Sequence, residues 1–298
     1  MKKIIITAFC YLCLNISYLL YANETQNLNF WLPVLEESQN IKRYYIEYAR
    51  GTSSSVTSSL DLKYNNTDIH MKDVNFEPEA YSWGQSQIRF FTILFGSDEG
   101  SLIGALTEPY YALRFNYFFE KYPFLGIGIE HTHFKIFLDD LNQNIQVSGK
   151  YMGSQINQND PIKKYFSMYS VSHGVNHIGF TASYRLMLLR KPEIPDGIIQ
   201  PYVSFSMGPA IPHVEVIYLE DGIPKGNAYE YQLNFANWGL SFNAGSRFKF
   251  LNNFGTYIES KIAYSILQGM SFQGNSGEGS IGSNFFSYHF QLGLFYAL

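Results

Sequence analysis

The stretch Phe124-Leu-Gly-Ile-Gly-Ile-Glu-His-Thr-His-Phe-Lys-Ile-Phe137 decides the fold class. Its odd positions Leu125, Ile127 and Ile129 are large and apolar, whereas the even positions between them are glycines. Successive side chains of a strand point to opposite faces, so one face of this strand favours hydrocarbon and the other is small. This pattern is typical of a narrow membrane barrel, which has an apolar outer wall and a crowded, polar interior.

The composition agrees with a barrel. Charged residues make up only 15% of the 298 residues and aromatic residues 17%, with 24 Tyr and 25 Phe, whereas charge in a soluble domain is usually near a quarter. A high aromatic content is typical of membrane barrels, in which girdles of aromatic residues flank the apolar band of the outer wall. The formal net charge of -4 argues against a nucleic-acid partner.

The first 22 residues have the features of a secretory signal peptide. Lys2 and Lys3 are followed by an apolar run and then by Ala22, after which the chain becomes polar. We interpret residues 1–22 as a signal peptide, 23–40 as a periplasmic segment and 41–298 as the barrel. Cys10 and Cys13 both fall inside the signal, so the mature chain would have no thiol for a disulfide, a metal or catalysis.

Strand-like alternation recurs in eight segments separated by connections that alternate between long and short. We predict strands at 41–51, 109–119, 124–137, 173–188, 199–216, 231–250, 254–266 and 284–298. The long connections are 52–108, 138–172, 217–229 and 267–282. The pattern predicts an all-β, antiparallel, up-and-down transmembrane barrel of eight strands with long extracellular loops, placed in a Gram-negative outer membrane by its assembly machinery. Gln87 to Phe95, within loop 52–108, would raise the number of strands to ten.

The predicted inward faces carry charges of both signs in near balance. These residues are Glu47, Glu130, Glu259, Arg114, Arg185, Arg247 and Lys261. Because buried charges must pair, we predict a structural plug of ion pairs instead of a channel. Pro209 and Pro212 interrupt one strand, which should bulge or bend there.

Several segments resemble one family of outer-membrane barrels, which includes the rhizobial lipid A oxidases. The matching residues are Pro109 to Arg114, Gly128 to Lys135, His173 to Asn176, Tyr184-Arg185, Pro201 to Gly208, Pro212 to Glu215, Tyr231-Gln232 and Glu259 to Lys261. The resemblance implies an oxidoreductase that uses molecular oxygen on the proximal glucosamine of lipid A and yields an aminogluconate. The chain departs from the pattern at His131, where an aromatic residue is expected, and in its longer first loop.

Strand parity predicts a polar patch on the outer wall, at the extracellular ends of neighbouring strands. Its candidate catalytic residues are His133, His213 and Glu215. Two imidazoles and a carboxylate are the ligand set of non-haem iron oxygenases, so the same three could bind one divalent metal such as iron. The His131 and His133 pair on one face is a further, weaker metal-site pattern.

Three more polar residues join this patch by parity. Lys135 would meet a phosphate of lipid A, and Asn176 and Gln232 would orient sugar hydroxyls. Lipopolysaccharide would then be the partner and substrate, approaching sideways from the outer leaflet. His173 and His177 are interpreted as histidines of a loop edge or of the lumen.

An alternative hypothesis needs no enzyme. Cations and histidines at the outer rim of a barrel ordinarily pair with lipopolysaccharide phosphates, so the chain could be a surface protein that binds a ligand or is purely structural. The parity argument brings no serine, histidine and acid together, so it predicts no hydrolytic triad.

Overall fold

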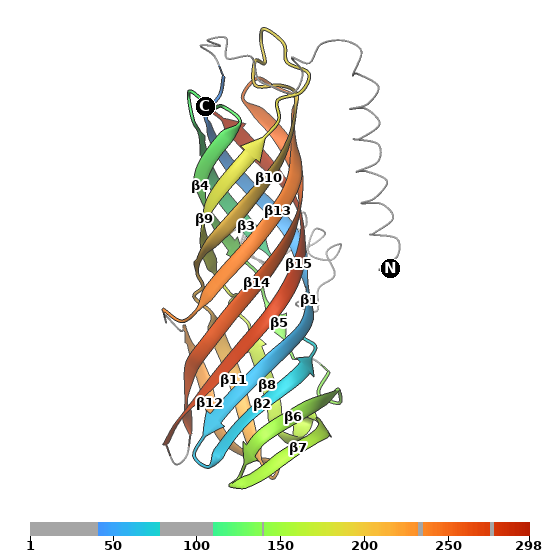
Figure 1. The fold of residues 1–298 in the computed structure, drawn as a ribbon, viewed down its shortest axis with the longest axis vertical. Coiled ribbons are helices and arrows are strands. Elements are labelled where there is room, and N and C mark those ends of the chain that lie inside the picture. Colours follow the sequence, from blue (N-terminus) through green and yellow to red (C-terminus); the bar gives the residue numbers. More distant parts are fainter. Residues whose placement is uncertain (1–40, 78–109, 139, 232–234, 275–276) are drawn as a thin grey trace, which may run out of the picture. The chain divides into compact units, whose positions relative to one another are not determined.

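A computed structural model describes residues 41–77, 110–138, 140–231, 235–274 and 277–298, which are mainly β-strand (Figure 1). The predicted signal peptide and the segment 23–40 lie outside these residues. Within the described ranges no helix is long and apolar enough to cross a membrane. The elements in chain order are β1 (Tyr44–Tyr64), β2 (Thr67–Val74), β3 (Tyr111–Phe118), β4 (Leu125–His133), β5 (Ile136–Phe137), β6 (Asn144–Tyr151), β7 (Ser154–Pro161), the 3-10 helix η2 (Ile162–Lys164), β8 (Phe166–Val171), β9 (His177–Arg185), β10 (Ile199–Pro209), β11 (His213–Glu220), β12 (Ile223–Tyr231), β13 (Trp238–Lys249), β14 (Phe254–Gly274) and β15 (Gly277–Ala297).

Eight of the described strands form a closed antiparallel ring. Its order is β1-β3-β4-β9-β10-β13-β14-β15, and β15 pairs back with β1. The predicted eight-stranded barrel is therefore confirmed. Closure satisfies the main-chain groups of every strand in the ring, which leaves no open edge there.

The outer wall of the ring is apolar, as the strand parity predicts. On β1, Tyr44 and Ile46 are about half exposed, whereas Tyr45 and Glu47 between them are fully buried. The same alternation holds on β9, where Phe180 is 69% exposed. This wall would be costly in water and suits contact with acyl chains.

Three strands of the ring continue far beyond it. β1, β14 and β15 have 21 residues each, about twice the 9 to 11 residues that a membrane-crossing strand needs. Past the ring, β1 pairs with β2, which continues to β6 and β7, while β14 pairs with β12, which continues to β11, β8 and β5. Glu77, after β2, and Phe137 in β5 exchange two main-chain hydrogen bonds of 2.8 Å each. These bonds join the strands that continue from β1 to those that continue from β14. The strands thus build a second closed layer, here called the extension, beyond the end of the ring and at the lower end of Figure 1.

The extension corrects the prediction of long loops. Residues 52–64 continue β1 instead of opening the predicted loop 52–108, and Gln87 to Phe95 lies outside the described residues. The predicted loops 138–172, 217–229 and 267–282 likewise contain strands. In the extension, residues such as Leu60 and Leu62 face a buried apolar core, and the polar residues between them face water. Because half of the residues of each such strand are polar, the sequence alone favours a loop there.

Three predicted strands also divide between the layers. The segment 124–137 becomes β4 in the ring and β5 in the extension. The segment 199–216 becomes β10, which stays in the ring, and β11, which leaves it for the extension after Pro209. The segment 231–250 includes only β13 as a ring strand. Proline cannot donate a ladder hydrogen bond, which explains why the strand breaks at the predicted position.

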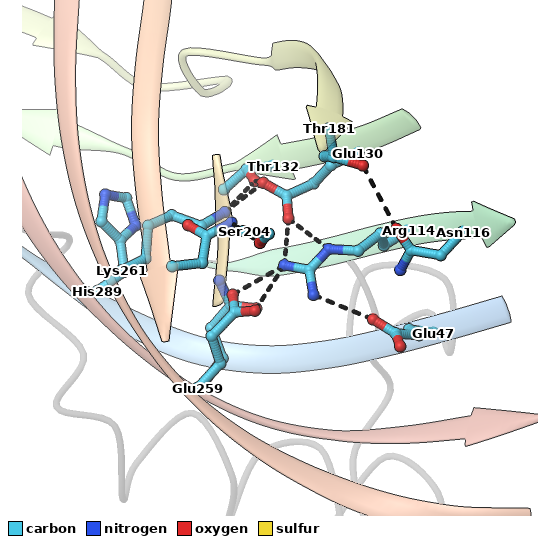
Figure 2. A network of polar contacts seen from close by, with 12 residues as sticks. Glu47, Arg114, Asn116, Glu130, Thr132, Thr181, Ser204, Glu259, Lys261 and His289 are labelled. Atoms are coloured by element: carbon cyan, nitrogen blue, oxygen red, sulfur yellow. Dashed lines mark hydrogen bonds and ion pairs between the residues drawn. The ribbon is translucent and has the colours of Figure 1, made fainter. Parts of the chain in front are cut away.

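Arg114 lies at the centre of a buried polar network inside the ring (Figure 2). Its guanidinium donates hydrogen bonds to Glu130 at 2.7 Å, Glu47 at 3.0 Å and Glu259 at 2.8 Å. The predicted plug of ion pairs is confirmed, since the side chains of this network are at most 2% exposed. Two further cations pair with these carboxylates: Lys261 with Glu130 and Arg247 with Glu47.

The hairpin of β6 and β7 is anchored at its base through Asp160. Its Oδ2 accepts hydrogen bonds from Tyr165 at 2.6 Å, Gln158 at 2.7 Å and Lys164 at 2.8 Å. Burial acts to raise the pKa of Asp160, but these hydrogen bonds outweigh it and hold the pKa below its ordinary value.

Candidate functional site

Two histidines continue the outer face of β4. His131 and His133 share the parity of the exposed Ile129, and β3 pairs with β4 without a register shift. Tyr111, the cross-strand partner of His133, stacks on its ring with a centroid separation of 5.1 Å. The register therefore places His133 on the outer wall of the barrel, beyond the apolar residues of β4.

A turn covers His133 and fixes its ring. Gly174 in that turn has φ +87°, and a Cβ at this position would collide with the His133 ring. His133 Nδ1 lies 2.9 Å from Asn176 Oδ1. The Asn176 amide nitrogen donates to the main-chain oxygens of His173 and Gly174 at 3.0 Å and of Ile211 at 3.1 Å. Asn176 thus ties the turn to the link between β10 and β11 and orients His133.

Beside this turn, His173, His213 and Glu215 form a cluster. One possible ligand atom from each residue lies within 4.8 Å of the others, the only such group of three among the described residues. The Nδ1 atoms of His173 and His213 are 3.1 Å apart. Ser170 donates to Glu215 Oε2 at 3.1 Å and orients the carboxylate. His213 and Glu215 alternate on β11 with buried valines, which places both on the outer side of the extension.

The donor set and its spacing suit a divalent metal. With metal–nitrogen bonds of about 2.1 Å, two ligands at right angles are roughly 3.0 Å apart, close to the separation of the two imidazole nitrogens. Two histidines and a carboxylate are also the ligands of non-haem iron sites. Burial, and then the neighbouring His173, lower the pKa of His213, which favours the neutral imidazole that binds metals.

The structure does not bring all of the predicted site residues together in one cluster. His133 contacts Asn176 and is not part of the three-residue cluster, where His173 stands in its place. Lys135 lies between β4 and β5 and is 7% exposed, and Gln232 lies outside the described residues. His177 faces the lumen, 2.9 Å from a main-chain oxygen of β13. Metal binding itself stays a prediction.

Sequence reasoning missed the role of His173 because this residue precedes β9 in a turn. Strand parity has no meaning outside a strand, so the argument that found His213 could not include His173. The only sequence signal was its position at the start of the His173 to Asn176 segment, one of the stretches that resemble the oxidase family.

The fold defines the class of protein. A closed antiparallel barrel with an apolar outer wall and a polar, packed interior spans a bacterial outer membrane by its strands, and this chain is an outer-membrane β-barrel. No family model and no curated protein matches the sequence.

The solved structures that are similar to this chain include three outer-membrane proteins. These are the outer membrane protein OprG from Pseudomonas aeruginosa (10% identity, 87% of this chain and 96% of that chain, TM-score 0.40), Neisserial surface protein A (9%, 86% and 97%, TM-score 0.35) and the outer membrane protease OmpT from Escherichia coli (11%, 89% and 99%, TM-score 0.39). Identities near 10% and TM-scores below 0.5 say nothing about activity, and the assignment to the class rests on the strand pairing itself.

Proposed function

We propose that this outer-membrane barrel is an enzyme that modifies lipid A from the outer leaflet. One observation carries the proposal: histidines from β4, from the turn before β9 and from β11 gather on the outer wall, just beyond the lipid-facing surface. Lipid A lies in the outer leaflet, so its sugars would reach this patch sideways while its acyl chains lie against the apolar ring. Lipopolysaccharide is thus the proposed partner, together with the machinery that assembles such barrels.

The proposed metal site consists of His173, His213 and Glu215. Iron bound there would supply the activation of molecular oxygen that oxidation of the proximal sugar requires, as the resemblance to lipid A oxidases implies. Ser170 holds the carboxylate in place, and the main-chain N–H of His213 donates to the Gly174 oxygen at 3.3 Å, which fixes the start of β11 against the turn. These two contacts hold Glu215 and the start of β11 against the turn that carries His173.

The neighbouring residues would bind the sugar. His133, oriented by Asn176, is proposed to contact the substrate beside the metal, while Lys135 and Gln232 keep their proposed roles toward a phosphate and a hydroxyl. The Asn176 amide nitrogen already donates to three main-chain oxygens, so we assign Asn176 to positioning His133 and not to substrate contact.

Two measurements on the same variants test this assignment. Lipid A from cells that express the chain is analysed by mass spectrometry, and metal bound to the purified barrel is measured by elemental analysis after loading with iron(II). We expect His213→Ala to abolish both the oxidised lipid A and the bound metal. His133→Ala should abolish the product and keep the metal. Glu120→Gln, at an exposed turn on the other end of the ring, should change neither.

Unmodified lipid A in cells with the native chain would contradict the enzyme hypothesis. The alternative, a non-enzymatic surface protein, is favoured by one observation, the outermost strand β7, whose polar residues are largely exposed along its length. In that case, deletion of the β6–β7 hairpin would abolish binding to a cell-surface ligand and leave lipid A unaltered.

A further inference from the structure

Three residues with complementary chemistry stand in a row across adjoining strands of the extension. Asp61 on β1 pairs directly with His70 on β2, and His70 pairs directly with Ser148 on β6. Direct cross-strand partners point to the same face of a sheet, and these strands lie side by side in Figure 1. An acid, a histidine and a serine therefore follow one another on one surface, although they are far apart in the sequence.

The surface that carries this row is the outer wall of the extension. Leu62, Ile69 and Val147, the sequence neighbours of the three residues, are buried in the apolar core, so the row itself faces outward. The side chains of Asp61 and His70 are 35% and 39% exposed. A reagent or substrate in the external medium can reach them.

The histidine is already oriented by the acid. His70 Nδ1 lies 2.6 Å from Asp61 Oδ1, the contact that fixes the tautomer of a catalytic imidazole and leaves Nε2 to take a proton. Because β2 lies between β1 and β6, the ring edge opposite Asp61 faces the strand that carries Ser148. Directly paired residues have Cβ atoms about 5 Å apart, within reach of a hydrogen bond between their side chains.

The serine is held only weakly in its present orientation. Ser148 Oγ lies 3.5 Å from the main-chain oxygen of His70, which is long for a hydrogen bond between oxygen atoms. A rotation about χ1 would turn the hydroxyl toward the imidazole, and catalytic hydrogen bonds are often loose before a substrate binds. Ser148 is followed by Gly149 at φ +116°, where a side chain would collide with a main-chain oxygen of β2.

A donor for the developing negative charge stands next to the serine. Asn157 on β7 pairs directly with Ser148, and its Oδ1 accepts a hydrogen bond from Gln146 Nε2 at 3.3 Å. That contact assigns the oxygen of the Asn157 amide as acceptor and leaves its NH2 group as the donor side. Side-chain amides serve as oxyanion donors in several acyl-transfer enzymes.

We propose that Asp61, His70 and Ser148 form a nucleophilic centre for acyl transfer from carboxylic esters at the cell surface. Ser148 Oγ bonds to the ester carbonyl carbon while His70 Nε2 takes its proton. The C–O bond to the alcohol then breaks, and His70 returns the proton to the leaving oxygen. Water, deprotonated by His70, cleaves the acyl-serine and restores the hydroxyl. This activity uses neither the metal cluster nor His133. Its test is therefore independent of the proposal of lipid A oxidation.

The test is covalent labelling of the full chain in detergent micelles with a fluorophosphonate, followed by peptide mass spectrometry. We expect the label on Ser148, and a labelling rate that falls at least about tenfold in His70→Gln and in Asp61→Asn, because general-base catalysis contributes about 10²- to 10⁴-fold. Hydrolysis of p-nitrophenyl butyrate should be lost in Ser148→Ala.

Matched controls lie on the same strands. Ser154 at the start of β7 is an exposed serine, and Asp68 is an exposed carboxylate on β2. In the Ser154→Ala and Asp68→Asn variants, the fluorophosphonate should label Ser148 at the same rate as in the native chain. Labelling of Ser148 no faster than that of Ser154, or an equal rate in His70→Gln, would overturn the proposal. The altered residues face outward, and circular dichroism of each variant verifies the barrel.

Discussion

Removing the central cation of the ring should destabilise the barrel far more than removing a similar cation at its surface. Within the network, Glu47, Glu130 and Glu259 are balanced by three cations, of which Arg114 contacts all three carboxylates. Arg114→Gln would leave three buried carboxylates with two cations. Among the described residues, the hydrogen bond left to Glu259 would then be the one from the Tyr202 hydroxyl at 2.7 Å.

The expected loss is about 3–5 kcal/mol in the free energy of unfolding, the cost of leaving a buried charge without its partner. This corresponds to roughly two to four orders of magnitude in the unfolding equilibrium constant. The same substitution at Arg43 removes an exposed pair with Glu120, whose side chain is 75% exposed, and should cost far less because water screens that pair.

Urea unfolding of the barrel in micelles or vesicles, followed by tryptophan fluorescence, measures both variants against the native chain. Double replacement of Arg114 and Glu259 by glutamine should recover part of the loss, because the unpaired carboxylate is then neutral. If Arg114→Gln costs no more than Arg43→Gln, the interior charges do not stabilise the ring by pairing, and the interpretation of the network as a structural plug is wrong.

Three further outcomes follow from local geometry. Gly174→Ala should displace the His133 ring and reduce any oxidised lipid A, as measured by mass spectrometry. Gly153, at φ +86°, has open space around it, so Gly153→Ala should leave lipid A unchanged. Its backbone strain should lower the free energy of unfolding in urea by only about 1–2 kcal/mol. Phe180→Arg places a charge on the lipid-facing wall and should cost about 2–4 kcal/mol if this residue lies near the midplane, measured as a lower midpoint of urea unfolding in lipid vesicles. Because the pKa of Asp160 is depressed, its hydrogen bonds stabilise the β6–β7 hairpin above about pH 4 and are lost as the pH falls further, so hydrogen exchange of β7 should accelerate there and not near pH 7.

Much of the ring could be predicted from single segments of sequence. In a strand of the ring, every second residue meets either acyl chains or the polar interior, so the period of two in Leu125, Ile127 and Ile129 is enough to assign inside and outside. The same rule placed Glu47 and Arg114 in the interior and His133 on the outer wall before any partner strand was known.

The extension could not be predicted in this way. There the outer medium is water and the inside is apolar, so the alternation has the opposite sense, and strands such as β2 and β6 have the average polarity of loops. Their pairing with the ends of β1 and β14 is set by contacts between distant segments, which no local pattern contains.

The sequence by itself determined which side chains face lipid and which face the lumen, because that property depends only on neighbours one and two positions away. Only the tertiary structure decided which residues meet across strands. His70 lies between Asp61 and Ser148 because hydrogen-bond register between strands fixes these pairs, and register depends on the closure of the whole barrel. His173 lies beside His213 because a main-chain hydrogen bond from His213 to Gly174 ties the turn to the start of β11.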